Sequence, residues 1–349
     1  MSAAPPGFPQ LYGWSFYVTQ HFRHDRLFLK RLNSMGSHTL ERWLEQERPD
    51  AVIHTFPAPV VPGFRKRNGL PPASYTIVTD FVLHPRWIRS GVDKYYVATD
   101  DLKPALTQRG VPAGNIRTTG IPLRSMFEEP ADPAVLRARY GIHPSRRVVC
   151  VMAGAYGVLN QVGRLGEALL AFDDMEVVFI CGKNTPLRQQ IEALLGGHPR
   201  VHVFGYVQAI QEIMAFSSCL ITKAGGITLA EAIAMSLPVI VFRPLPGQEK
   251  ENARYLAGKG AVEIVYRPEE LAERIRGAPG PRTTGAEQRG HPGPAQALCG
   301  RCGSTGHMER YPPAGGRDKA ARLTAAIVKG GRASRCYANG YPIGDLFSS

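Results

Sequence analysis

The sequence predicts an α/β protein built from two doubly wound domains, and three observations support this. Short β-rich apolar runs alternate with helical segments along most of the chain, which is typical of parallel βαβ units. The 349 residues exceed what one hydrophobic core usually organises, so two domains are expected. Residues 126–145 are polar and contain proline between two alternating series, so we interpret them as an interdomain linker.

The first series, residues 1–125, predicts an N-terminal domain. Residues 11–48 look helical, because Leu40, Trp43 and Leu44 fit one helix face. Apolar runs predict strands at 51–56, 76–81, 94–99 and 116–122. A helical pattern at 101–110 predicts a helix between the last two strands.

The second series, residues 146–275, predicts an open parallel sheet. Strands are expected at 147–154, 176–182, 201–206, 218–225, 238–244 and 261–266, and helices at 158–172, 185–196, 208–216, 227–236 and 249–258. Sheets of this kind bind ligands at the carboxyl ends of their strands. A binding site is therefore expected in the loops that follow these strands.

Residues 276–314 form a tail with a different composition. Gly, Pro, Arg, Ser and Thr dominate without a hydrophobic period, which predicts disorder, and a helical pattern at 315–331 predicts a C-terminal helix. Cys299, Cys302 and His307 match part of a zinc knuckle, but the fourth ligand position holds Pro312. Structural zinc needs four ligands, so we predict no metal site.

The formal net charge of +13 favours an anionic partner. Because the basic residues are scattered and no RNA-recognition signature is present, we expect no nucleic-acid partner and favour an anionic membrane surface. A solvated basic surface without a partner stays open as the alternative.

Three features indicate a cytoplasmic protein that does not span a membrane. No apolar run reaches the roughly 18 residues of a membrane-spanning helix, and residues 1–10 lack the apolar core of a signal peptide. Cys150, Cys181 and Cys219 lie in or beside apolar runs, which indicates small buried side chains in a reducing compartment.

The segment 221–256 carries the strongest chemical signal. An expected strand leads into Ala224-Gly225-Gly226, and Thr228 then opens a helix. Glycines let an anion approach the backbone, and the N–H groups and dipole of a helix N-terminus favour a diphosphate. Glu231 lies three residues after Thr228, where it could accept hydrogen bonds from ribose hydroxyls. The same spacing suits a helix capping box, and both roles can coexist.

The second half of this segment has the chemistry of a sugar site. Pro246-Gly247-Gln248-Glu249 follows an expected strand and opens a helix, and Asn252 lies one turn further on. Gln248, Glu249 and Asn252 are the bidentate partners that hexose hydroxyls need. A polar loop with a helix cap is the alternative.

The run ITKAGGITLAEAIAMSLPVIVFRPLPGQEKENA resembles the nucleotide-sugar motif of glycosyltransferase family 28. The resemblance is to bacterial processive diacylglycerol glucosyltransferases and plant monogalactosyldiacylglycerol synthases. It is weaker to the transferase that adds N-acetylglucosamine to the lipid-linked cell-wall precursor. Similar segments at 35–57, 78–127, 151–162 and 204–207 extend the likeness over residues 11–275.

The resemblance implies a GT-B fold, with two Rossmann-like domains, and a set of site residues. On the donor side, Gly154, Gly157, Gly225 and Gly226 would face the diphosphate, Tyr206 and Val207 the uracil, Thr228 and Glu231 the ribose end, and Gln248, Glu249 and Asn252 the hexose. On the acceptor side it implies Asp80, His84 and Trp87, with Asp80 and His84 as catalytic candidates. A structural role for these three, as turn former, satisfied polar residue and core residue, stays open.

The implied reaction is inverting transfer of a hexose from a UDP-sugar to diacylglycerol, with glucose favoured over galactose. No cofactor is expected, because glycine N–H groups and helix dipoles can stabilise the departing UDP. The enzyme would lie on the inner face of the plasma membrane. A lipid-linked cell-wall acceptor, and a UDP-sugar-binding protein without catalysis, are the alternatives.

The sequence departs from the family pattern at its N-terminus. Family members begin with a strand and a GxGH loop whose His is the usual general-base candidate, whereas GWSFYV at 13–18 already corresponds to a later region. We therefore expect the N-terminal domain to lack that strand and loop, and the sequence identifies no general base.

Overall fold

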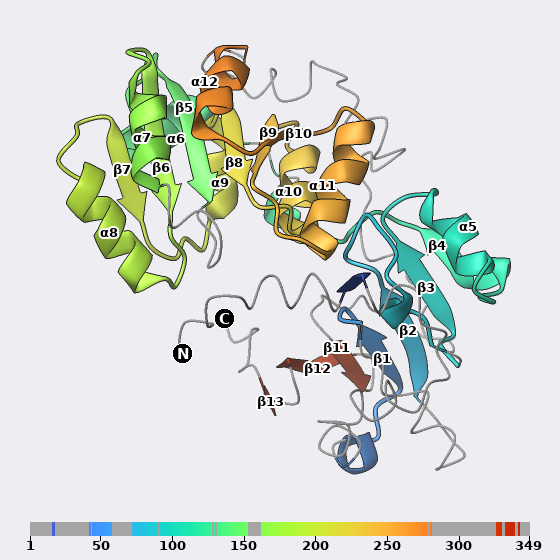
Figure 1. The fold of residues 1–349 in the computed structure, drawn as a ribbon. Coiled ribbons are helices and arrows are strands. Elements are labelled where there is room, and N and C mark those ends of the chain that lie inside the picture. The colour runs from blue at the N-terminus through green and yellow to red at the C-terminus, as the bar shows by residue number, and fades with distance from the viewer. Residues whose placement is uncertain are drawn as a thin grey trace. The chain divides into compact units, whose positions relative to one another are not determined.

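The computed structural model describes residues 16–17, 42, 44–57, 72–89, 91–127, 129, 131–152, 162–277 and 280, and the backbone of 326–329, 332–338 and 341–342. The chain divides into two compact units. The C-terminal unit comprises Leu123–Arg301 with Met1–Gly13, and the N-terminal unit comprises Trp14–Pro122 with Cys302–Ser349 (Figure 1).

The C-terminal unit contains a six-stranded parallel sheet in the order β10-β9-β8-β5-β6-β7. The strands are β5 (Arg147–Met152), β6 (Met175–Ile180), β7 (Val201–Phe204), β8 (Cys219–Thr222), β9 (Val239–Phe242) and β10 (Glu263–Val265). Helices cover both faces of this sheet, which is why its strands read as nearly continuous apolar runs. Each strand overlaps one of the six predicted ranges.

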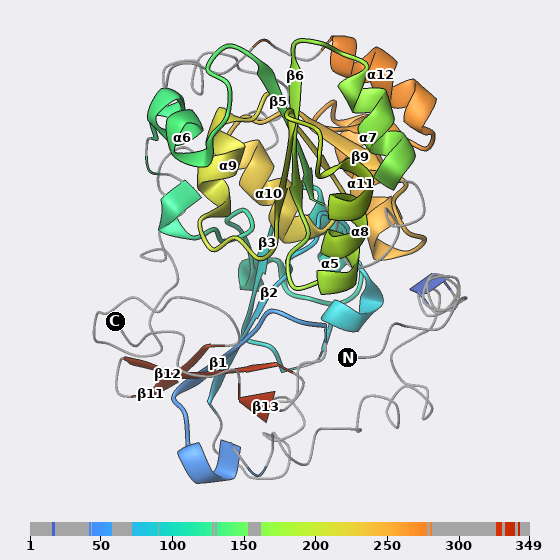
Figure 2. The ribbon, with the colours of Figure 1, turned by 90° about the vertical axis from the view of Figure 1, so that its left-hand side faces the viewer.

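The described part of this unit contains seven helices: α6 (Pro133–Tyr140), α7 (Val162–Leu170), α8 (Thr185–Leu195), α9 (Ile210–Phe216), α10 (Gly226–Ala234), α11 (Gln248–Gly258) and α12 (Pro268–Arg276). The helices α7 to α11 connect successive strands, whereas α6 precedes β5 and α12 follows β10. With the sheet seen nearly edge-on, α6, α9 and α10 lie on one face, and α7, α8 and α12 on the other (Figure 2). This is the doubly wound arrangement that the sequence predicts.

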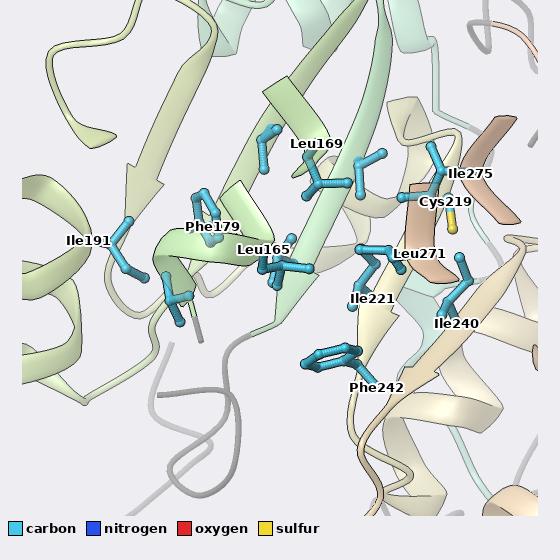
Figure 3. Close-up of a cluster of buried hydrophobic side chains, with 14 of the residues drawn as sticks. Leu165, Leu169, Phe179, Ile191, Cys219, Ile221, Ile240, Phe242, Leu271 and Ile275 are labelled. Carbon is cyan, nitrogen blue, oxygen red and sulfur yellow. The ribbon is translucent and has the colours of Figure 1, made fainter. Parts of the chain in front are cut away.

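A hydrophobic core cluster fills the space between one sheet face and α7, α8 and α12. Leu165 and Leu169 recur at helical spacing on α7 and are fully buried against strand residues such as Phe179 (Figure 3). Burying a side chain of this size contributes about 1.5–3 kcal/mol. Leu271 and Ile275 on α12 close the same cluster.

Strand β5 pairs with β6 on one side and with β8 on the other. The chain therefore runs outward through β6 and β7 and then returns to the opposite side of β5. The helices that follow β5 and β8, α7 and α10, lie on opposite faces of the sheet (Figure 2), and ligands bind at such switch points in open α/β sheets.

Helix α6 corrects the linker prediction for residues 126–145. Asp132 accepts a hydrogen bond from the Ala134 N–H, Pro133 occupies the first turn, and Gly141 ends the helix at φ 69°. The buried Arg137 donates to the carbonyls of His143, Arg146 and Phe216. The segment is therefore part of the C-terminal unit, and its capping residues were misread as linker composition.

The N-terminal unit contains four parallel strands, β1 (Ala51–His54), β2 (Ala73–Ile77), β3 (Lys94–Val97) and β4 (Ile116–Thr118), in that order. Helix α5 (Leu102–Thr107) connects the last two. Strand β2 begins three residues before the predicted range, so that Asp80 follows it in a loop. Residues 16–17, 42 and 44–47 are helical and Leu44 is buried, whereas Leu40 and Trp43 lie outside the described residues.

The C-terminal helix predicted at 315–331 is wrong at its described end. Residues Ala326–Lys329 form β11, which pairs antiparallel with β1, and β12 (Arg332–Ala338) and β13 (Tyr341–Pro342) extend the sheet. The β-branched pair Ile327-Val328 favours a strand, and β1 offers an open edge for pairing. The remainder of the helix, and nearly all of the predicted disordered tail, lie outside the described residues.

Candidate active site

The loop between β8 and α10 has the geometry of an anion site. Gly225 lies just before the helix with extended backbone, and α10 begins at Gly226. The first N–H groups of a helix have no intrahelical acceptor and carry the positive end of the dipole. A Cβ placed on Gly225 would meet no atom within 4 Å, and its φ of −72° suits any residue. The fold itself therefore does not require glycine at 225, whereas close approach of a ligand would.

The capping-box interpretation of Thr228 and Glu231 is wrong. Because α10 begins at Gly226, Thr228 is already the third helical residue, and Gly225 at the N-cap makes no side-chain cap hydrogen bond. Glu231 consequently lies on the second turn and is not held by a cap. Its carboxylate is left for another role.

Glu231 is a buried acid beside a single arginine. Its Oε1 lies 3.9 Å from Nη2 of Arg124. Burial raises the pKa of Glu231 to about 7, and the positive charge of Arg124 opposes part of this rise. The carboxyl therefore titrates close to neutral pH.

The start of α11 brings the predicted hexose-binding residues against the same loop. Gly247 precedes the helix at φ 100°, a conformation that other residues adopt only under strain. Lys223 Nζ donates to Glu249 Oε1 at 2.8 Å. Asn252 is fully buried, and its Nδ2 donates to the Ala224 carbonyl at 3.4 Å.

These contacts place the loop between β8 and α10 and the first turns of α11 side by side. The structure thus brings together Gly225, Gly226, Glu249 and Asn252, with Gln248 at the first position of the same helix. Sequence reasoning missed Lys223 and Arg124. Lys223 directly precedes the Ala-Gly-Gly run, and a basic residue beside such an anion loop was the signal available.

Tyr206 and Val207 follow β7, at the carboxyl edge of the same sheet. The Tyr206 ring is 67% exposed, and Lys183 Nζ lies 5.7 Å from its centroid. An exposed ring with a cation on it is suited to contact with a planar base. Gly154 and Gly157 lie outside the described residues, between β5 and α7 in the sequence.

In the N-terminal unit, the predicted acceptor-side residues form a buried cluster. The indole Nε1 of Trp87 donates to Asp80 Oδ2 at 3.2 Å, and both side chains are almost completely buried. An Asp held in this way orders the loop after β2. This geometry favours the structural interpretation of both residues.

The hydrogen bonds of His84 fix its protonation state. The Arg86 N–H donates to Nδ1 at 3.1 Å, so Nδ1 is an acceptor, and Nε2 lies 3.2 Å from the Phe16 carbonyl, to which only an N–H can donate. His84 is therefore neutral with its proton on Nε2, and both nitrogens are used. As a general base it would first have to break one of these bonds.

Two Rossmann-like units, one with a glycine-led helix start and polar side chains at its sheet edge, match the architecture of GT-B glycosyltransferases. Residues 7–123 match the family model of monogalactosyldiacylglycerol (MGDG) synthase, and residues 148–278 that of the glycosyltransferase family 28 C-terminal domain.

The chain is 41% identical over 268 residues to the processive diacylglycerol β-glucosyltransferase of Bacillus subtilis (strain 168), covering 75% of this chain and 70% of that one. It is 40% identical over the same length, with the same coverage, to the enzyme of that name from Bacillus licheniformis. The chain belongs to glycosyltransferase family 28, as a relative of these enzymes, and is a hexosyltransferase.

Solved structures share the fold. Staphylococcus aureus MnaA with UDP matches with a TM-score of 0.53 at 15% identity, covering 70% of this chain and 69% of that one. The UDP-GlcNAc 2-epimerase of Neisseria meningitidis matches with a TM-score of 0.52 at 16% identity, covering 73% and 75%. The predicted GT-B fold class is thereby confirmed.

Proposed function

We propose that the enzyme transfers a hexose from a UDP-sugar to diacylglycerol with inversion at the anomeric carbon, using glucose in preference to galactose. The two Bacillus relatives described above are named for glucosyl transfer to diacylglycerol, which supports the acceptor and the preferred sugar. Galactose remains the alternative donor sugar, because the N-terminal part matches the MGDG synthase model. The single observation that carries the proposal is the junction of the α10 start with Glu249 and Asn252.

In this reaction a glycerol hydroxyl oxygen attacks the anomeric carbon from the face opposite UDP. The bond from that carbon to the diphosphate oxygen breaks, and its electron pair leaves with UDP. Backbone N–H groups at the start of α10 would stabilise the charge that develops on the diphosphate, so the proposal includes no cofactor. The hydroxyl proton passes to a base that we do not assign to a described residue.

Donor recognition would use groups at or near the carboxyl ends of the strands in the C-terminal unit. Tyr206 and Val207 would border the uracil, and Glu231 would accept hydrogen bonds from ribose hydroxyls. Gly154, Gly157, Gly225 and Gly226 would face the diphosphate, Thr228 would line the helix start, and Gln248, Glu249 and Asn252 would bind the hexose.

We further propose that the enzyme acts at the anionic inner face of the plasma membrane. The net charge of +13 supports this, since each well-placed basic residue contributes about 1 kcal/mol to binding an anionic surface. In the described part of the chain, no helix has both the length and the apolar character needed to cross a membrane.

The test is release of UDP from UDP-glucose and from UDP-galactose by the full chain with diacylglycerol in anionic vesicles, beside a titration with UDP. Release that depends on diacylglycerol, faster with UDP-glucose, is expected. UDP binding without release under any condition would identify a nucleotide-sugar-binding protein without catalysis. Release only with a lipid-linked cell-wall intermediate would show that this intermediate is the acceptor and diacylglycerol is not.

A further inference from the structure

The ion pair between Lys223 and Glu249 joins two parts of the donor site. Lys223 is the first residue after β8, and Glu249 is the second residue of α11. Nζ of Lys223 lies 2.8 Å from Glu249 Oε1, whereas the other carboxylate oxygen, Oε2, is buried and has no hydrogen-bond partner among the described residues. The carboxylate is thus held by one oxygen and unsatisfied at the other.

We propose that Lys223 is a positioning residue for the donor sugar, which acts by orienting Glu249. This inference rests on the proposed function, because it assigns Oε2 of Glu249 to a hydroxyl of the hexose. An ammonium group donates but cannot accept, so its bond to Oε1 occupies that oxygen and leaves Oε2 for a hydroxyl donor. A hydroxyl that reached Oε2 would satisfy an oxygen that is costly to leave unpaired.

The surroundings of the pair explain why its position matters. A second hydrogen bond, from Asn252 Nδ2 to the Ala224 carbonyl, joins the segment after β8 to α11 beside the ion pair. The segment that carries Lys223 and Ala224 continues directly into Gly225 and the start of α10. Lys223 therefore holds the hexose-binding carboxylate at a fixed place relative to the diphosphate loop.

A purely stabilising role for this pair is the weaker explanation. The Lys223 side chain is 38% exposed, and ion pairs with this degree of exposure contribute little to stability. Orientation of the carboxylate does not depend on that small contribution. The two roles predict different binding measurements. Only loss of the carboxylate's orientation would weaken the affinity for a ligand that carries a hexose more than the affinity for one that lacks it.

The experiment compares UDP with UDP-glucose in calorimetric titrations of the full chain and of Lys223→Met. We expect UDP-glucose affinity to fall about tenfold and UDP affinity to change less than twofold, as for loss of a ligand hydrogen bond to a charged group. Lys223→Arg, which keeps a donor to Glu249, should recover most of the loss. Lys103→Met is the matched control, since it breaks a 2.7 Å pair with Asp100 in the N-terminal unit and should change neither affinity.

A double-mutant cycle with Glu249→Gln tests whether Lys223 acts through Glu249. In the Glu249→Gln background, Lys223→Met should cause no further loss of UDP-glucose affinity. Equal losses for UDP and UDP-glucose, or additive losses in the double variant, would overturn the inference in favour of a direct diphosphate contact. A native chain that binds neither ligand would instead refute the proposed function on which the inference rests.

Discussion

Arg124 and Glu231 form a long ion pair in the C-terminal unit, with Nη2 of the arginine 3.9 Å from Oε1 of the acid. Burial nevertheless dominates, since it raises the pKa of Glu231 to about 7 against the opposing charge of Arg124. The carboxyl proposed to bind the ribose is therefore only partly ionised near neutral pH. Two pH-dependent properties follow from this pairing.

UDP should bind more tightly as the pH rises from 6 to 8. The ionised carboxylate accepts hydrogen bonds from ribose hydroxyls at both oxygens, and its population grows about tenfold over this range for a pKa near 7. Titrations of the native chain and of Glu231→Gln with UDP measure the effect. Ionisation of UDP itself affects binding to both proteins equally. An equal pH dependence of UDP affinity in both proteins would therefore contradict the role of Glu231.

The free energy of unfolding should depend on pH in the opposite direction. An acid whose folded pKa is raised binds more protons folded than unfolded between about pH 4.5 and 7, so stability falls as the pH rises through this window. Relative to that of the native chain, the free energy of unfolding of Glu231→Gln should therefore be about 2 kcal/mol higher at pH 8 than at pH 5. Urea unfolding at both pH values measures this gain, and a pH-independent difference would contradict it.

His54, at the end of β1, should make the chain sensitive to acid. Burial lowers its pKa to about 4, and its Nε2 has no hydrogen-bond partner in the part of the chain that the structure describes. The unfolded chain binds a proton from pH 6.5 downward but the folded chain does not, so stability is lost as the pH falls toward 4. His54→Leu should remove about 2 kcal/mol of the native chain's loss between pH 7.5 and pH 5. Identical acid unfolding curves for the two proteins would show that another group is responsible.

Gly225 should be needed for UDP binding but not for folding. Because an added Cβ meets no atom within 4 Å, Gly225→Ala should leave the free energy of unfolding within about 0.5 kcal/mol of native. The same methyl group would stand where the diphosphate approaches the helix, so UDP affinity should fall at least about tenfold. Gly114→Ala, whose Cβ also meets no atom within 4 Å, is the control and should keep native affinity. If Gly225→Ala binds UDP with native affinity, the diphosphate does not bind at this helix start.

The donor half of the fold could be predicted because its signals are local. Apolar runs located all six strands of the C-terminal unit, and the run Ala224-Gly225-Gly226 located the helix start that follows β8. Helix α6 was missed because its Asp132-Pro133 start was read as linker composition. The N-cap of α10 was displaced by three residues, since Thr228 resembles a cap while Gly225 holds that position.

The relationships that define the site could not be predicted, because they depend on contacts between distant segments. Lys223 and Glu249 are 26 residues apart, and nothing in either segment indicates that they pair. The hydrogen bond from Nε2 of His84 goes to the carbonyl of Phe16, 68 residues away. The strand β11 required the edge of β1, which the sequence around 326–329 does not reveal.

The most direct test of the central claim is transfer of labelled glucose from UDP-glucose into extracted lipid, with diacylglycerol vesicles and with Glu249→Gln and Lys103→Met in parallel. The proposed function predicts a β-linked glucosyl diacylglycerol with the native chain and Lys103→Met, and at least about tenfold less product with Glu249→Gln. Label that stays in water although UDP-glucose binds, or equal product from all three proteins, would contradict it.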